Sequence, residues 1–204
     1  MRVEQCRSKR VFSVVIQTIP LFPLSVLLLP GEECALHIFE ERYRRLIAQS
    51  IEESLGFGIP CNHAMNTLNV GSLVEVQQVN RRYPGGESDI VVRCTGLFRL
   101  NRFFYRLNEE LYPGGEVEML EWKQSMQNEF EQSADFMSDP HQAPVAVAHV
   151  LSKAVGLGYD LADKLQYVRQ LRQGEGLRYL ERRNEYYDLI RLQESKTEAG
   201  FYLN

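Results

Sequence analysis

Residues 19–47 read IPLFPLSVLLLPGEECALHIFEERYRRLI, and this stretch decides how the chain begins its fold. It opens as an apolar run that is interrupted by Pro20, Pro23 and Pro30. Proline inside a short helix removes a hydrogen bond and clashes with the preceding turn, so the run suits neither a secretory signal helix nor a membrane-spanning helix. No small-residue cleavage motif follows it. We therefore expect residues 1–17 to be retained and the protein to be soluble and cytoplasmic, with no membrane partner.

The same stretch predicts an irregular strand, a turn, a second strand and a helix. Residues that precede proline favour extended geometry, so residues 19–24 should form an edge or irregular strand. After the Pro-Gly turn signal, residues 34–39 alternate as a short strand. From Glu40 the apolar residues recur at helical spacing. They are Tyr43, Leu46, Ile47, Ser50, Ile51 and Leu55. Gly56 and Gly58 are expected to end this helix.

This order of motifs resembles the opening of the Lon-protease N-terminal domain family. The resemblance rests on a P-L-F-P-L strand, a P-G turn and an L-x-[IV]-F-E-x-R-Y motif. The matching residues are Leu21, Phe22, Pro23, Leu24, Pro30, Gly31, Leu36, Ile38, Phe39, Glu40, Arg42 and Tyr43. Later segments at 70–76, 94–100 and 115–120 also resemble strands of that family, and alternate as strands on their own. The resemblance covers about residues 19–192.

We predict an α+β chain, because the strands come first and the helices follow. The resemblance implies an N-terminal PUA-like β pseudo-barrel that carries one helix, followed by a C-terminal α-helical bundle. The expected divisions are an extension at 1–18, a β-rich part at 19–120, a helical part at 121–195 and a tail at 196–204.

The second half carries helical patterns. Residues 121–139 place Trp122, Met126, Phe130 and Met137 on one side of a helix. Residues 145–155 are apolar nearly all round, which predicts a buried helix and makes His149 a core histidine. Asp160 should cap the next helix. A long helix is expected over 177–192, with Leu180, Tyr187 and Ile190 inward.

The sequence Tyr-Pro-Gly-Gly-Glu occurs at 83–87 and again at 112–116. Proline followed by glycine suits the two central positions of a type II turn. A phosphate-binding loop is a poorer interpretation of both, because no G-x-x-x-x-G-K-[ST] motif is present.

Composition and motifs favour binding over chemistry. The net charge is −4, so no general attraction to nucleic acid exists. The cysteines are scattered and indicate free thiols, and no histidines stand at metal-ligand spacing. Ser152 and Lys153 are adjacent and point to different helix faces, so they form no dyad. We expect no catalytic residues, no metal and no cofactor, and hence no enzyme.

The motif Phe39, Glu40, Arg42 and Tyr43 is a candidate peptide-binding or structural site. In the structural interpretation Tyr43 is a core residue and Arg42 pairs with a carboxylate or carbonyl on the barrel. Aromatic residues exposed on loops would be better binding candidates. Those considered are Phe57, Tyr83, Tyr105, Tyr112 and Phe201. A groove is also expected where the barrel meets the bundle.

The resemblance implies a non-enzymatic protein- or peptide-recognition module. It corresponds to the substrate-recognition domain of a protease whose ATPase and peptidase lie in later domains. The expected partner is a protein or peptide, such as unfolded polypeptide. The alternative is an RNA-binding protein that uses an arginine-rich helical face, although the acidic net charge disfavours nucleic acid. The arginines of that face are Arg169, Arg172, Arg178, Arg182, Arg183 and Arg191.

Overall fold

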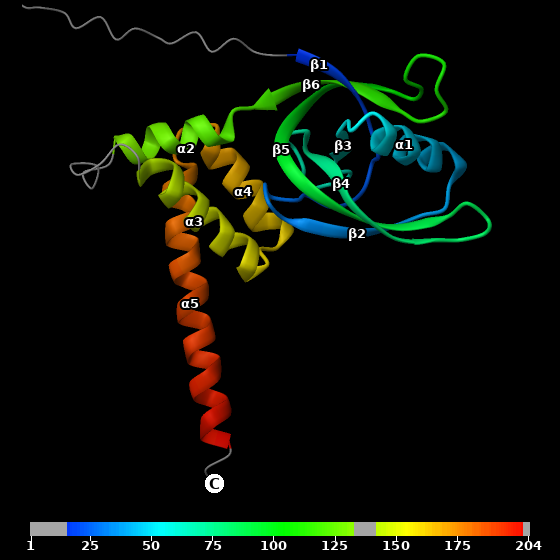
Figure 1. Cartoon of the computed structure of the whole chain (residues 1–204). Coiled ribbons are helices and arrows are strands. Elements are labelled where there is room, and N and C mark those ends of the chain that lie inside the picture. The colour runs from blue at the N-terminus through cyan, green and yellow to red at the C-terminus, as the bar shows by residue number, and fades with distance from the viewer. Residues whose placement is uncertain (1–15, 133–141, 202–204) are drawn as a thin grey trace, which may run out of the picture.

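The computed structural model describes residues 16–132 and 142–201, with side chains up to Leu192 except those of Glu131 and Gln142. Its strands are β1 (Ile16–Pro20), β2 (Glu33–Ile38), β3 (Phe57–Pro60), β4 (Val70–Arg82), β5 (Ser88–Phe104) and β6 (Gly114–Leu120). Its helices are α1 (Glu41–Glu52), α2 (Trp122–Glu131), α3 (Gln142–Leu157), α4 (Leu161–Leu171) and α5 (Gly176–Phe201). A curved sheet with α1 forms one part, and the other helices gather beside it (Figure 1). The predicted α+β class is confirmed.

The strands form one antiparallel sheet in the order β1-β6-β5-β4-β3, and β2 pairs separately with β5. The long β5 therefore binds β4 along one edge and both β2 and β6 along the other. Two isolated bridges, Leu21 with Gly58 and Leu24 with Cys61, join the chain after β1 to β3 and its continuation. Residues 19–24 were predicted to form an edge or irregular strand. The irregular strand is confirmed, but it is no edge, because the segment has partners on both sides and closes the curved sheet.

The helix α1 covers the barrel with Tyr43, Leu46, Ile47 and Ser50, all buried. The prediction that Ile51 and Leu55 share this buried face is wrong, since they are 38% and 55% exposed. The helix ends at Glu52, and the backbone then bends through Ser54, whose φ is 53°. That bend carries Leu55 away from the barrel. Gly58 does not end the helix either, because it lies within β3.

The two Tyr-Pro-Gly-Gly-Glu segments adopt different structures. The first is a turn closed by a hydrogen bond of 2.9 Å from Gly86 N to Tyr83 O. It is not type II, because the positive φ of 91° falls on Gly86, one residue later than predicted. The second segment is no turn at its glycines, which lie in β6. A Cβ at Gly115 would stand 2.7 Å from Leu21 Cδ1 and 2.8 Å from Arg102 O, so close packing requires glycine there.

The helical part shares an apolar core with the barrel. The fully buried Tyr167 and Met126 lie in one cluster with Leu27, Leu29 and Leu97 of the β-rich part. Asp160 caps α4 as predicted, accepting a hydrogen bond of 2.8 Å from Asp163 N. Leu180 lies fully buried on α5, also as predicted. Met137 lies outside the described residues.

The prediction that α3 is buried all round, with His149 in the core, is wrong. Ala143, Val147, Leu151 and Ala154 face inward, whereas His149 is exposed. The inward residues recur every three or four positions, because α3 packs against α2 and α5 on one side only.

The expected division at 18/19 falls inside β1, and the one at 195/196 falls inside α5. In the described part of the chain, no helix is both long and apolar enough to cross a bilayer.

Candidate functional site

The predicted motif lies where β2 ends and α1 begins, and its members differ in exposure. Phe39 is 61% exposed, whereas Tyr43 is only 6% exposed and packs on Phe22 with ring centroids 4.2 Å apart. Arg42 Nε donates to Glu40 Oε2 over 2.8 Å, so its carboxylate partner is the neighbouring helix-start residue. The expected partner on the barrel is therefore wrong. The motif combines a structural anchor, Tyr43, with an exposed aromatic, Phe39.

Phe39 belongs to a surface group of three rings and one carboxylate that we call the β2–hairpin cluster: His37, Phe39, Tyr83 and Asp89. His37 stacks on Phe39 with centroids 6.0 Å apart and meets Tyr83 edge-on at 5.8 Å. Asp89 of β5 links His37 of β2 to Tyr83 of the hairpin turn. Its Oδ1 lies 2.6 Å from His37 Nδ1, and its Oδ2 accepts a hydrogen bond of 2.7 Å from Tyr83 Oη. The cluster thus holds an aromatic surface in place beside the β4–β5 hairpin.

These hydrogen bonds lower the pKa of the Asp89 carboxyl, with the Tyr83 hydroxyl as the main cause and His37 next. A carboxyl with a lowered pKa contributes stability that is present at neutral pH and lost as the pH falls through its folded pKa. We expect Tyr83→Phe to raise the pKa of Asp89 toward its ordinary value, as measured by carboxyl carbon NMR titration. Tyr105→Phe is the control, because Tyr105 is 88% exposed and makes no contact with Asp89. An unchanged Asp89 titration in Tyr83→Phe would contradict the assignment.

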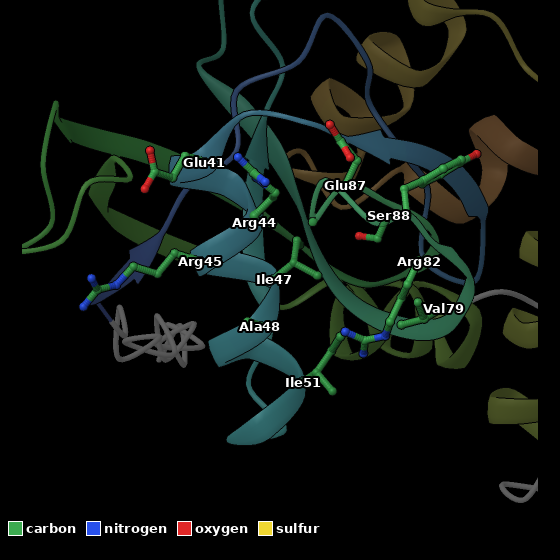
Figure 2. Close-up of a pocket in the computed structure, with 12 residues that line it drawn as sticks. Glu41, Arg44, Arg45, Ile47, Ala48, Ile51, Val79, Arg82, Glu87 and Ser88 are labelled. Carbon is green, nitrogen blue, oxygen red and sulfur yellow. The ribbon is translucent and has the colours of Figure 1, made fainter.

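Next to this cluster, a cleft of about 500 Å³ separates α1 from the β4–β5 hairpin. Figure 2 shows this α1–hairpin cleft, with Ile47 and Ile51 on the helix side and Val79 on the strand side. Arg44 crosses one end, where its Nη1 donates to Gly85 O over 2.6 Å. Its lining mixes apolar side chains with charges of both signs, which suits side chains of a bound polypeptide.

A second groove, of about 380 Å³, lies at the junction of barrel and bundle. It is lined by the Pro30-Gly31 turn, by Trp122 at the start of α2 and by Leu151 and Val155 of α3. The groove expected at this junction is present.

Cys94 and Lys153 are not arranged as nucleophiles. Burial raises the pKa of the Cys94 thiol to about 12, so it is a poor nucleophile. Lys153 is paired with Asp188 at 2.5 Å. No group of three or more metal-ligating side chains occurs in the part that the structure describes.

The model of the ATP-dependent protease La (LON) substrate-binding domain matches residues 18–192. The chain belongs to this family.

Solved structures of Lon N-terminal domains share its fold. A Lon N-terminal domain protein from Xanthomonas campestris is 21% identical, with a TM-score of 0.56 over 81% of this chain and 96% of that one. The N-terminal domain of the Mycobacterium avium complex Lon protease is 17% identical, with a TM-score of 0.50 over 83% of this chain and 98% of that one.

One of the six arginines of the predicted arginine-rich face is not available to an anion. Arg183 is paired with Asp163 at 2.9 Å and lies over Tyr187, within the bundle. The other five arginines of the predicted face are exposed: Arg169, Arg172, Arg178, Arg182 and Arg191.

Sequence reasoning missed the β2–hairpin cluster and the α1–hairpin cleft. His37 and Asp89 are 52 residues apart, so their contact becomes visible only once β2 is paired with β5. Two signals were available: strand alternation puts His37 and Phe39 on one face of the strand, and Tyr83 was a candidate exposed aromatic. Of the other aromatic candidates, Tyr105 is exposed and Phe57 and Tyr112 are buried, and the side chain of Phe201 lies outside the described part of the chain.

Proposed function

We propose that this chain is a non-enzymatic recognition module that binds extended or unfolded polypeptide where β2, α1 and the β4–β5 hairpin meet. The observation that carries the proposal is Phe39, a 61% exposed aromatic beside an open cleft in a member of a substrate-binding family. Large aromatic side chains contribute strongly to protein interfaces, and an exposed one held in place by neighbours loses little entropy on binding.

The surroundings of Phe39 support a protein partner. The ring is stacked on His37, and the cleft behind it offers Ile51 and Val79 to apolar side chains. The site is shallow and open, so affinity rests on passive contacts. We expect dissociation constants of about 1 μM or weaker, as is typical of small transient interfaces.

The test is a fluorescence titration with a reduced, alkylated and therefore unfolded protein, and in parallel with single-stranded RNA, at low and moderate salt. We expect binding of the unfolded protein to wild type, and Phe39→Ser to weaken it about tenfold or more, which is ~1.4 kcal/mol. Tyr105→Ser is the matched control, since Tyr105 is also an exposed aromatic but stands outside the cleft.

Equal affinities of wild type and Phe39→Ser for the unfolded protein would reject this location. Tight RNA binding that weakens steeply with salt, without polypeptide binding, would support the RNA-binding alternative, because counterion release drives such complexes.

A further inference from the structure

We propose that the polypeptide is bound by strand addition, as an extended segment that pairs with the open edge of β2. This inference rests on the proposed function and gives it a geometry. β2 runs along the lower rim of the barrel in Figure 1, from the side of α4 toward the hairpin, and ends next to Phe39.

The edge is regular and its backbone groups can be assigned. β2 pairs with β5 without a register shift, from Glu33 opposite Arg93 to Ile38 opposite Ser88. The hydrogen bond from Cys94 N to Glu32 O shows that Glu32 and Cys94 form a hydrogen-bonded pair, just before β2 begins. Because bonded and non-bonded pairs alternate in an antiparallel ladder, Cys34, Leu36 and Ile38 bond β5.

The backbone N–H and C=O groups of Glu33, Ala35 and His37 therefore point to the opposite side. Within the described residues no other strand pairs with β2. At this edge the Cys34 thiol lies 3.6 Å from Ala35 O, which makes only a weak hydrogen bond. Such a row of donors and acceptors is a template for another extended chain.

The other sheet edges are closed or irregular, which singles out β2. The bridge from Leu21 to Gly58 links the two ends of the sheet. Beyond Val74, β4 has no partner on its β3 side among the described strands, but register shifts at Val76/Gln78 and Val79/Arg81 disrupt that edge. Charged side chains, above all lysine, proline and bulges are the usual protections of an edge strand. The sequence of β2, ECALHI, carries one charge, at Glu33 at its start, and has no lysine, proline or bulge.

The side chains of β2 indicate which segment fits. Cys34 and Leu36 are half-buried against the barrel core, so every second residue of the added strand should be apolar. The opposite face continues to Phe39, whose ring lies at the end of the edge. An alternating apolar segment of about six residues would match the length of β2.

The charges at the start of β2 and at the start of α1 favour a basic partner. Glu33 and Glu41 are exposed, and neither makes an ion pair within the described part of the chain, although Glu33 stands opposite Arg93. Glu32 and Glu40, by contrast, are paired with Lys164 and Arg42. Two unpaired carboxylates attract lysine or arginine at the flanks of the segment and repel a phosphate backbone. The expected occupant is thus an alternating apolar segment flanked by basic residues.

The experiment uses a fluorescent peptide of alternating valine and threonine with lysines at both ends, titrated by anisotropy. Ala35→Pro removes one outward N–H without taking a hydrogen bond from the β5 ladder, and proline is tolerated at an edge. We expect it to weaken peptide binding about tenfold or more, as loss of strand pairing should. Ala35→Val keeps the N–H and should bind as wild type does. Denaturation midpoints of both variants check the fold.

The peptide supplies a test that needs no change in the protein. N-methylation of every second amide blocks one edge of a strand, so we expect one of the two alternating sets to abolish binding and the other to leave it intact. If Ala35→Pro is unfolded, this pair of peptides decides alone. Equal binding of both methylated peptides would overturn strand addition while leaving the proposed function standing. No binding of either the peptide or an unfolded protein to wild type would overturn both.

Discussion

Tyr43→Ala is expected to lower the free energy of unfolding by about 3 kcal/mol or more, as large-to-small aromatic changes in cores do. Tyr43 is 6% exposed and packs in the barrel core with Phe22, Leu46 and Ile47. Its ring also lies 4.2 Å from that of Phe22 and beneath the Arg42 guanidinium at 4.7 Å. Alanine would leave a cavity between α1 and the sheet, where the surrounding strands cannot collapse freely.

The measurement is urea denaturation followed by circular dichroism, and Phe39→Ala is the matched control. Phe39 is an aromatic four residues earlier, but it is exposed, so its truncation should change stability by no more than about 0.5 kcal/mol. An unchanged midpoint for Tyr43→Ala would show that the helix is loosely attached, and would return Tyr43 to the list of binding residues.

The elements that could be predicted from sequence are those whose local pattern agrees with their tertiary surroundings. In β2, every second residue from Cys34 to Ile38 faces the core, so the predicted strand alternation is confirmed. In α1, Tyr43, Leu46 and Ile47 share a face because a barrel lies along it. The proline-interrupted segment also closes the sheet, since Leu21 and Leu24 bridge to the β3 side.

The wrong predictions concern segments whose local sequence pattern is the same but whose contacts in the fold differ. Pro84-Gly85 and Pro113-Gly114 are followed by the same residues, yet the second pair leads directly into β6. Gly115 is required by its close contacts with Leu21, which is distant in sequence, and with Arg102 on the neighbouring strand β5. Likewise α3 is apolar enough to be buried all round, but the bundle covers one face only.

The candidate site was predicted only in part for a related reason. Motif resemblance placed Phe39 and Tyr43 together, although exposure separates them into a surface residue and a core residue. The partners that hold the site, Tyr83 and Asp89, come from the hairpin. A pattern within one segment carries no information about such contacts between segments.

The ion pair between Lys164 and Glu32 joins the helical part to the start of β2. Lys164 Nζ lies 2.6 Å and 2.8 Å from the two carboxylate oxygens of Glu32, and Glu32 Oε2 also accepts from Leu29 N over 2.9 Å. The side chains are 9% and 18% exposed, so water contributes little to either charge. The charge of the Glu32 carboxylate is therefore balanced mainly by Lys164 of α4.

Lys164→Met is expected to cost about 3–5 kcal/mol of folding stability, because it leaves a buried carboxylate without its counter-charge. Lys153→Met is the matched control: its partner Asp188 is equally close at 2.5 Å, but those side chains are 39% and 44% exposed. An exposed pair of this kind contributes about 0–1 kcal/mol. Adding Glu32→Gln to Lys164→Met removes the orphaned charge, so the double variant should be more stable than Lys164→Met alone. Equal small losses in Lys164→Met and Lys153→Met would show that burial does not strengthen the link between barrel and bundle.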